Sequence, residues 1–221
     1  MKFRNLFIVL LVGIGFIFAS CSDDESEQGE ITTGIFILNQ GGSEGNNAGI
    51  TAYNPETGAI TRDIYRSQNG KDLGDTGQDM IVYGDKVYVS VYGSSRLVKM
   101  DKNGVERASL SFDVSTDGQP RYIEAEDGKL YVTNGSLSNK IVSIYDAKTL
   151  VNIGVIPHLG NTIVTTNLVF DDVHVYLGIQ TNASSDSRLR KYNKITGTLV
   201  ATSIYNPFVD VATYKSFGTI T

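Results

Sequence analysis

Hydrophobic residues occur along this chain in short runs rich in β-branched and aromatic side chains, separated by polar turns that contain Gly, Asn or Asp. Such runs are typical of β-strands, and Asx turns with a nearby Gly suit tight connections between antiparallel strands. Beyond residue 30, no window of about ten residues shows the apolar stripe of an amphipathic helix, which repeats every 3.6 residues. The pattern therefore predicts an all-β protein.

An aromatic residue inside these runs recurs at nearly constant intervals. Phe36, Tyr88, Tyr131 and Tyr176 are spaced by 52, 43 and 45 residues, and the Asx turns that follow them by 47, 45 and 47 residues. The turn residues are Asn54, Asp101, Asp146 and Asn193. Two signals repeating at one period predict a repeat architecture, and four short antiparallel strands per unit describe a β-propeller blade. A β-sandwich with similar hairpins is the alternative, but it does not explain why both intervals agree.

Within a unit we expect an inner strand A, as at 79–83, 122–125 and 167–170, and then a strand B with the aromatic residue. Strands C and D follow, joined by the Asx turn. Strand order then places the A–B and C–D turns on one face and the longer, polar B–C and D–A loops on the other. Binding residues are disproportionately found on long loops held by a rigid scaffold. The long-loop face is therefore where we expect a ligand.

Several motifs resemble those of a known group of proteins. They are Leu130–Asn134 (LYVTN), Asn39–Gly42 (NQGG), Gly77–Asp79 (GQD) and Asp117–Arg121 (DGQPR). Over most of residues 34–205 the chain resembles the YVTN-repeat, YncE-like β-propeller lipoproteins of Bacteroidetes, a group of unassigned function. The resemblance implies a ring of about seven blades, and BtuG-type surface propellers, which capture cobalamin beside an outer-membrane transporter, are relatives of the group.

This chain holds about four units, which leaves two interpretations. The first unit begins at a strand B, and 208–214 has the pattern of a strand A with no strand B after it. The last strand could complete the first blade and close a four-bladed ring. Alternatively, the chain is part of a seven-bladed ring. The tail 215–221 lacks the Gly-Asp-Lys turn found at 84–86, which favours the second interpretation.

The first thirty residues predict the subcellular localisation of the protein. A basic start and an apolar stretch over 6–18, shorter than the about 20 residues that span a bilayer, predict a signal peptide over 1–20. The sequence FASC at 18–21 resembles a lipobox, in which Cys21 becomes the lipidated first residue. An acidic tether over 21–30 follows, and the propeller is expected over 31–221. The start of the tether resembles a Bacteroidetes surface-export signal made of Ser22, Asp23, Asp24 and Glu25. This predicts an anchor in the outer membrane facing the exterior; a plain solvated tether facing the periplasm is the alternative.

Composition narrows the possible partners. The net charge of −5 becomes −7 once residues 1–20, with Lys2 and Arg4, are removed, and no Lys/Arg run is present. Nucleic acid, which requires a basic surface, is therefore excluded as a partner. Cys21 is the single cysteine, so the mature domain has no disulfide. The spacing of His158 and His174 suggests neither a metal site nor a catalytic group, and no cofactor is expected.

The expected binding face carries amides, a phenol and a guanidinium that suit neutral polar ligands such as sugars or amide-bearing cofactors. The candidate residues are Asn39, Gln40, Gln78, Tyr92, Gln119, Arg121, Asn134, Asn167 and Gln180. Each could instead cap a loop by hydrogen bonding a neighbouring backbone group. We expect a non-enzymatic surface lipoprotein that binds a ligand or partner protein, with capture of cobalamin or a glycan as one form. The alternatives are a propeller enzyme, lactonase-like or a quinone-dependent dehydrogenase, and a purely structural surface protein. The chain has no Trp and few acidic residues in these loops, which speaks against the enzymes.

Overall fold

The structure is a computed structural model that describes residues 34–135, 140–157, 162–181 and 187–205. The chain divides into two compact units, 1–30 and 31–221, and all described residues belong to the second. The expected signal peptide, Cys21, the acidic tether and the final segment 208–214 lie outside the described residues. Within the described ranges, no helix is long and apolar enough to cross a membrane.

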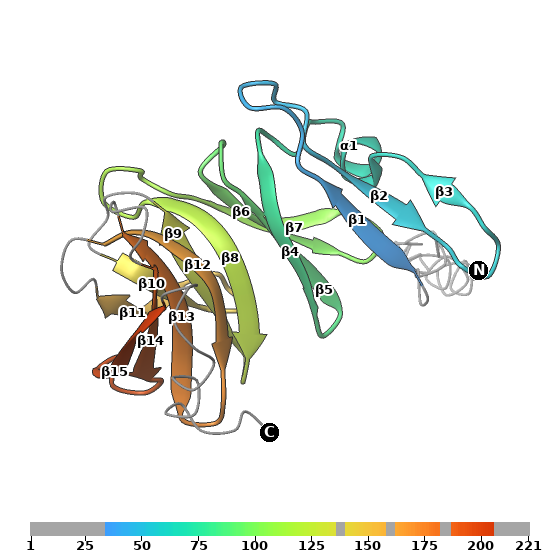
Figure 1. The fold of residues 1–221 in the computed structure, drawn as a ribbon. Coiled ribbons are helices and arrows are strands. Elements are labelled where there is room, and N and C mark those ends of the chain that lie inside the picture. Colours follow the sequence, from blue (N-terminus) through green and yellow to red (C-terminus); the bar gives the residue numbers. More distant parts are fainter. Residues whose placement is uncertain (1–33, 136–139, 158–161, 182–186, 206–221) are drawn as a thin grey trace, which may run out of the picture. The chain divides into compact units, whose positions relative to one another are not determined.

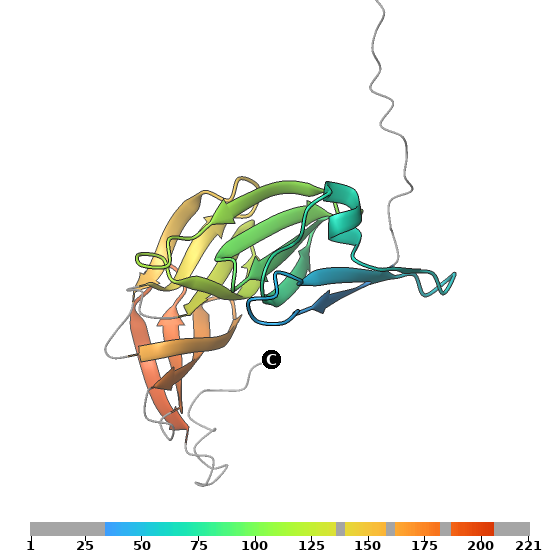
Figure 2. The ribbon, with the colours of Figure 1, turned by 90° about the horizontal axis from the view of Figure 1, so that it is seen from above.

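The described residues form fifteen strands and one short helix, and the all-β prediction is confirmed. Sheets follow one another in chain order in Figures 1 and 2, and neighbouring strands are antiparallel. The first sheet contains β1 (Ile35–Asn39), β2 (Gly49–Tyr53) and β3 (Ile60–Thr61). The second contains β4 (Gly77–Tyr83), β5 (Lys86–Val91), β6 (Arg96–Asp101) and β7 (Glu106–Ser111). The third contains β8 (Gln119–Glu126), β9 (Lys129–Gly135), β10 (Lys140–Asp146) and β11 (Asn152–Pro157). The fourth contains β12 (Thr162–Phe170), β13 (His174–Thr181), β14 (Ser187–Asn193) and β15 (Leu199–Tyr205).

Each of the last three sheets is one four-stranded blade with the predicted order A to D. A single residue pair, Val164 with Gly135, joins β12 to β9 and makes the third and fourth sheets formally continuous. The first sheet has three strands and starts at a strand B, as the repeat predicted. The described residues therefore form a β-propeller of three four-stranded blades and one blade without strand A.

The Asx turns have the geometry that their sequence predicted. The Oδ1 atom of Asn54 accepts hydrogen bonds from the backbone N–H groups of Glu56 (2.9 Å) and Thr57 (3.2 Å). Asn193 Oδ1 does the same for Ile195 (3.0 Å) and Thr196 (2.8 Å). In each unit the side chain of one Asx residue thus satisfies the backbone of the C–D turn.

Alternate residues of each blade pack against opposite neighbours, which is the two-residue period of a strand. In β5, Val87, Val89 and Val91 face the first sheet, while Tyr88 faces the third. Three buried clusters result, one at each contact between successive sheets, and they share no residue. One of the recurring aromatic residues also bonds the next blade: the hydroxyl of Tyr88 donates to the carbonyl of Ala147 over 2.8 Å. The repeat therefore reflects contacts between blades as well as within them.

The helix α1 (Ile64–Asn69) was not expected from the sequence, because its six residues are too few to show a helical period. Its ends carry recognisable signals. The Asp63 side chain accepts from the N–H of Arg66 (3.2 Å), and Gly70 ends the helix in the left-handed conformation. Ile64 and Tyr65 are buried, and they fill the space between the first two sheets.

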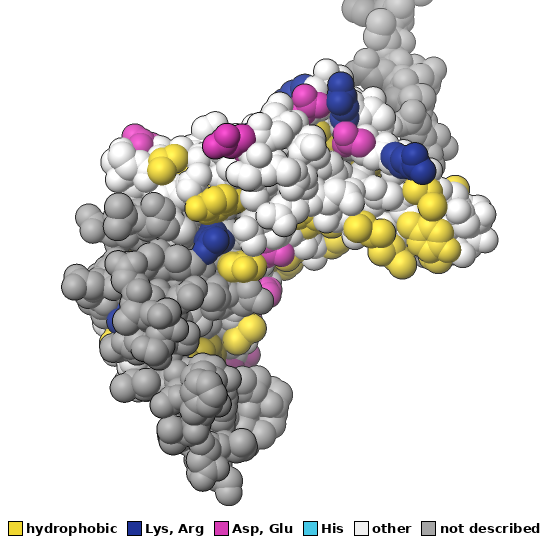
Figure 3. Space-filling view, turned by 45° about the horizontal axis from the view of Figure 1, so that its top comes forward, with side chains coloured by type: hydrophobic (Ala, Val, Ile, Leu, Met, Phe, Trp, Pro, Cys, Tyr) yellow, Lys and Arg dark blue, Asp and Glu magenta, His cyan; other side chains and the backbone are white. Residues whose placement is uncertain are grey.

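One face of the first sheet is open among the described residues. Ile35, Ile37 and Ile60 are 51%, 49% and 63% exposed, although Phe36 and Leu38 on the opposite face pack into the core. Hydrophobic side chains gather on this side of the space-filling view (Figure 3). Strand A of a complete blade would pair with the free edge of β1, whereas this open face is where a further blade would pack.

Candidate functional site

The long loops of neighbouring blades lie together, as the strand order predicted. The β1–β2 loop meets the segment before β4: Ala48 N–H donates to the carbonyl of Gly74 (3.0 Å) and Gly77 N–H to that of Gln40 (3.0 Å). The β5–β6 loop meets the same segment, because Tyr92 N–H donates to the carbonyl of Thr76 over 2.8 Å. The first two blades therefore share one loop surface.

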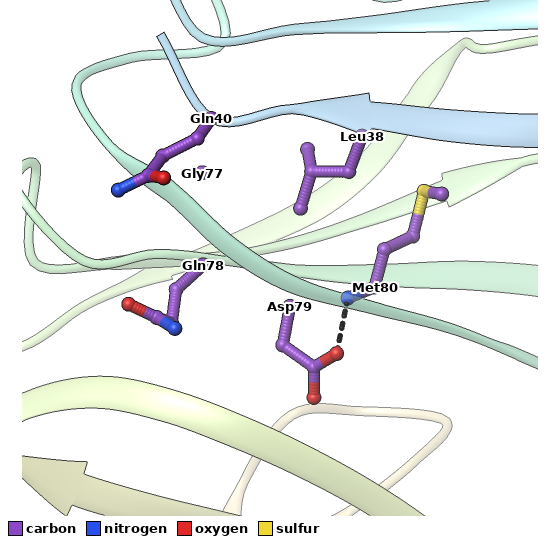
Figure 4. A pocket seen from close by; sticks show the side chains of 6 residues that line it. All are labelled: Leu38, Gln40, Gly77, Gln78, Asp79 and Met80. Atoms are coloured by element: carbon purple, nitrogen blue, oxygen red, sulfur yellow. Dashed lines mark hydrogen bonds between the residues drawn. The ribbon is translucent and has the colours of Figure 1, made fainter. Parts of the chain in front are cut away.

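A hollow of about 370 Å³ opens at this surface between β1 and β4. It is lined by Leu38, Gln40, Gly77, Gln78, Asp79 and Met80. We call it the β1–β4 hollow. Figure 4 shows Leu38 and Met80 facing each other at one end, with the amides of Gln40 and Gln78 at the other. The hollow thus combines two apolar side chains with the polar groups of Gln40, Gln78 and Asp79, a mixture that can hold a small polar ligand.

Gly77 lets the two strands approach closely at this hollow. A Cβ at this position would lie 2.9 Å from Cδ1 of Leu38 and 3.4 Å from Cβ of Ala48. A larger residue would push β4 away from β1. The glycine of the GQD motif therefore belongs to the packing that shapes the hollow.

Asp79 points from the hollow towards β8, and backbone groups hold both of its carboxylate oxygens. Oδ2 accepts from the N–H of Ile123 (2.8 Å) and Oδ1 from that of Met80 (2.9 Å). Burial raises the pKa of Asp79, which these hydrogen bonds only partly offset. Burial also raises the pKa of Glu124 on β8, and the charge of Asp79 adds to that increase. Two acidic groups thus lie on adjacent inner strands, and Asp79 fixes β4 against β8.

A second group of polar side chains lies on β8 and the β5–β6 loop. The guanidinium carbon of Arg121 lies 5.0 Å from the centroid of the Tyr92 ring, a cation–π contact. Gln119 Nε2 donates to the carbonyl of Tyr92 over 3.2 Å. A Cβ added to Gly135 would lie 2.9 Å from Cδ of Arg121 and 3.2 Å from Cε2 of Tyr92, so both side chains lie against β9. We call Tyr92, Gln119 and Arg121 the arginine platform.

The platform and the β1–β4 hollow are joined through one hydroxyl. Ser90 Oγ, which is fully buried, donates to the carbonyl of Arg121 and lies 3.4 Å from the carbonyl of Asp79. Five of the nine candidate residues therefore belong to two neighbouring groups on one face: Gln40, Gln78, Tyr92, Gln119 and Arg121.

The other candidates have different places. Asn39 is exposed and donates to Oγ1 of Thr51 (3.1 Å), and Asn134 is buried and donates to Oγ of Ser143 (2.9 Å). Both bonds hold strands together, which is the structural role that the sequence left open. Asn167 lies in β12 and Gln180 in β13, and the structure describes only their backbones.

The histidines add no further group to the site. His174 begins β13 beside Asp171, with 3.4 Å between Nδ1 and Oδ2, and His158 lies outside the described residues. Among the described residues, no three His, Cys, Asp or Glu side chains are grouped so as to hold a metal.

Sequence reasoning missed Leu38, Asp79 and Met80 as lining residues of the hollow, because they lie inside predicted strands. An acidic residue in an inner strand was the available signal for Asp79. Such a residue is seldom buried without a specific partner. Leu38 and Met80 carry no signal that separates them from core residues.

The four-stranded antiparallel units, their successive packing and the shared loop face define this protein as a β-propeller. Residues 33–172 match the family described as a domain of unknown function, DUF5074, and the chain belongs to that family. No curated protein matches the chain.

Solved structures that resemble the chain are propellers or larger proteins of low sequence identity. Kuenenia stuttgartiensis hydrazine synthase has a TM-score of 0.63 at 14% identity, over 78% of this chain and 46% of that one. The propeller domain of Myceliophteria thermophila Cps50 (Swd1) has a TM-score of 0.54 at 11% identity, over 77% and 58%. A protein of unknown function from Bacteroides caccae has a TM-score of 0.53 at 12% identity, over 73% and 61%. The chain thus spans about half the length of the first of these structures, and at such identities the likeness concerns the fold alone.

Proposed function

We propose that this DUF5074 protein is a non-enzymatic surface lipoprotein that binds a small polar ligand at the long-loop face. The observation that supports the proposal most is the β1–β4 hollow, whose amides from Gln40 and Gln78 lie opposite an apolar wall. Amides donate and accept hydrogen bonds at once, which suits sugar hydroxyls and amide-bearing cofactors.

The subcellular localisation in this proposal is inferred from the first thirty residues. Cys21 would carry the lipid, and Ser22 to Glu25 would direct the chain to the outer face of the outer membrane. The YVTN-type motifs support a place among Bacteroidetes surface propellers, where nutrient capture beside an outer-membrane transporter is one role. Cobalamin and neutral glycans are therefore the first ligands to test.

The carboxylates at the site support binding over catalysis. Asp79 points from the hollow towards β8, and both of its oxygens accept backbone hydrogen bonds, so this group positions strands. A catalytic acid or base needs direct access to the group that it protonates or deprotonates.

The test is calorimetry of the full chain in detergent with cobalamin and a panel of neutral oligosaccharides. Replacing Gln40 and Gln78 together by Ala should weaken binding at least about tenfold, because two neutral hydrogen bonds are lost. Gln68→Ala is the matched control, since Gln68 is exposed on α1 away from the hollow.

Intact cells that express the chain should bind the ligand, and cells with Cys21→Ser should not. Absence of binding across the whole panel would refute small-ligand capture.

A further inference from the structure

Arg121 differs from Arg66, Arg96 and Arg107 in having no carboxylate partner among the described residues. Arg96 pairs with Glu106 at 2.7 Å and Arg107 with Asp101 at 2.7 Å, and Arg66 pairs with Asp72 at 3.2 Å. No described residue accepts a hydrogen bond from the guanidinium of Arg121, and its Nε is buried. In a chain with a net charge of −5, a half-buried arginine without an ion pair is unexpected.

The side chain of Arg121 is nevertheless held in place. Its guanidinium stacks on Tyr92, and its methylene groups lie against Gly135. The carbonyl of Arg121 accepts from Ser90, and Tyr92 is fixed through its own N–H and carbonyl. Stacking leaves the edge of the planar guanidinium available for hydrogen bonding. The structure thus restricts the guanidinium before any ligand arrives, which reduces the entropy lost on binding.

The acidic groups on β4 and β8, Asp79 and Glu124, form no ion pair with Arg121. Both oxygens of Asp79 accept from backbone N–H groups. Burial raises the pKa of Glu124, and the charge of Asp79 adds to that increase. Arg121 therefore has donor capacity that the described protein leaves unused.

We propose that the arginine platform is an anion-binding subsite, in which Arg121 receives a carboxylate or phosphate group of the ligand. A guanidinium offers two parallel N–H donors that match the oxygens of either group. This inference rests on the proposed function, because it assigns a charge to the ligand of the same face. The neutral part of the ligand would occupy the β1–β4 hollow beside the platform.

The test follows the arginine Nε–H signals of the full chain in detergent by NMR. Sodium phosphate and sodium succinate are titrated separately against sodium chloride at constant ionic strength. We expect a saturable shift of the Arg121 Nε–H and Gly135 amide signals. A response to phosphate alone or succinate alone identifies which oxyanion the platform accepts, and either response supports the proposal.

Four variants make the test specific. Arg121→Gln keeps hydrogen-bonding groups without the charge and should weaken anion binding at least about tenfold, the loss expected for a charge-assisted hydrogen bond. Arg121→Lys keeps the charge but not the two parallel N–H donors of the guanidinium, so its affinity for the anion should lie between those of wild type and Arg121→Gln. Arg62→Gln is the control, because Arg62 is exposed and pairs with no described carboxylate. Tyr92→Leu removes the stacking partner and should weaken binding while leaving Arg121 in the chain.

Two results would overturn the inference. One is the absence of any saturable shift with both anions, and the other is an equal shift of Arg62 and Arg121, which would indicate general screening. Either result leaves the proposed function standing if the Gln40 and Gln78 variant still loses affinity for cobalamin or a glycan. If calorimetry detects no ligand and NMR detects no anion binding, both proposals are refuted together.

Discussion

Acid should destabilise this protein through Glu106, whose carboxylate joins α1 to the second blade. Glu106 accepts hydrogen bonds from the Tyr65 hydroxyl and from Arg96 (2.7 Å), and Lys71 Nζ lies 2.9 Å away. Burial alone would raise the pKa of Glu106. Hydrogen bonds from Tyr65, Lys71 and Ser109, with the charge of Arg96, outweigh burial and lower the pKa from 4.5 to about 2.

The lowered pKa of Glu106 determines how the stability of the protein changes with pH. Because the folded pKa lies below the unfolded one, the stabilisation is complete above about pH 4.5 and is lost as the pH falls towards 2. The side chain is only 14% exposed, so solvent screening is limited. Between pH 6 and pH 3 the loss from Glu106 is about 2 kcal/mol. This is a large part of the 5–15 kcal/mol typical of a folded domain.

Urea unfolding followed by circular dichroism at pH 6 and pH 3 measures this loss. Other carboxylates also titrate, so the informative quantity is the difference between wild type and Glu106→Gln, which lacks the titrating group. Wild type should lose about 2 kcal/mol more than the variant between the two pH values. Glu44→Gln, at an exposed carboxylate without an ion pair to any described residue, should behave like wild type. Equal losses in wild type and Glu106→Gln would refute the reasoning.

Two further substitutions, together with the control Gly84→Ala, test the contacts between blades by thermal or urea unfolding. Gly104→Ala, at φ +88°, would place a Cβ 2.8 Å from Cγ1 and 3.1 Å from the carbonyl oxygen of Ile64, and should cost about 2–4 kcal/mol. Gly84→Ala, at φ +62° with open space around it, should cost only about 1–2 kcal/mol, because it places a residue with a side chain in the left-handed conformation. An equal loss of stability at Gly84 and Gly104 would contradict the packing argument. Tyr88→Phe removes the buried hydrogen bond to Ala147 and should cost about 1–2 kcal/mol, so an unchanged free energy of unfolding would show that this bond adds nothing.

The repeat in the sequence predicted most of the fold because its two signals are physical contacts. Tyr88 recurs as an aromatic residue since it reaches the next blade, and Asn54 recurs as an Asx residue since its side chain satisfies a turn. Periodic signals of this kind are local and can be counted along the chain. Helix α1 was missed because a single short turn of helix has no period, although Asp63 and Gly70 mark its ends.

The candidate site was predicted less completely, for a different reason. Polar residues in loops, such as Gln40 and Gln78, are visible in the sequence, but the same residue types also close gaps between strands. Asn134 is the example, since its amide bonds Ser143 inside the core. Sequence alone does not separate the two uses, because the distinction depends on which strand lies opposite.

The three buried clusters lie at successive contacts between sheets and have no residue in common. In such a linear array each sheet is coupled directly only to its nearest neighbours, and the free energy is close to a sum of unit and interface contributions. A substitution in one cluster therefore acts directly on one interface and leaves the other two intact. The packing between two sheets can thus change while the other described pairs of sheets keep the loop surface that they form.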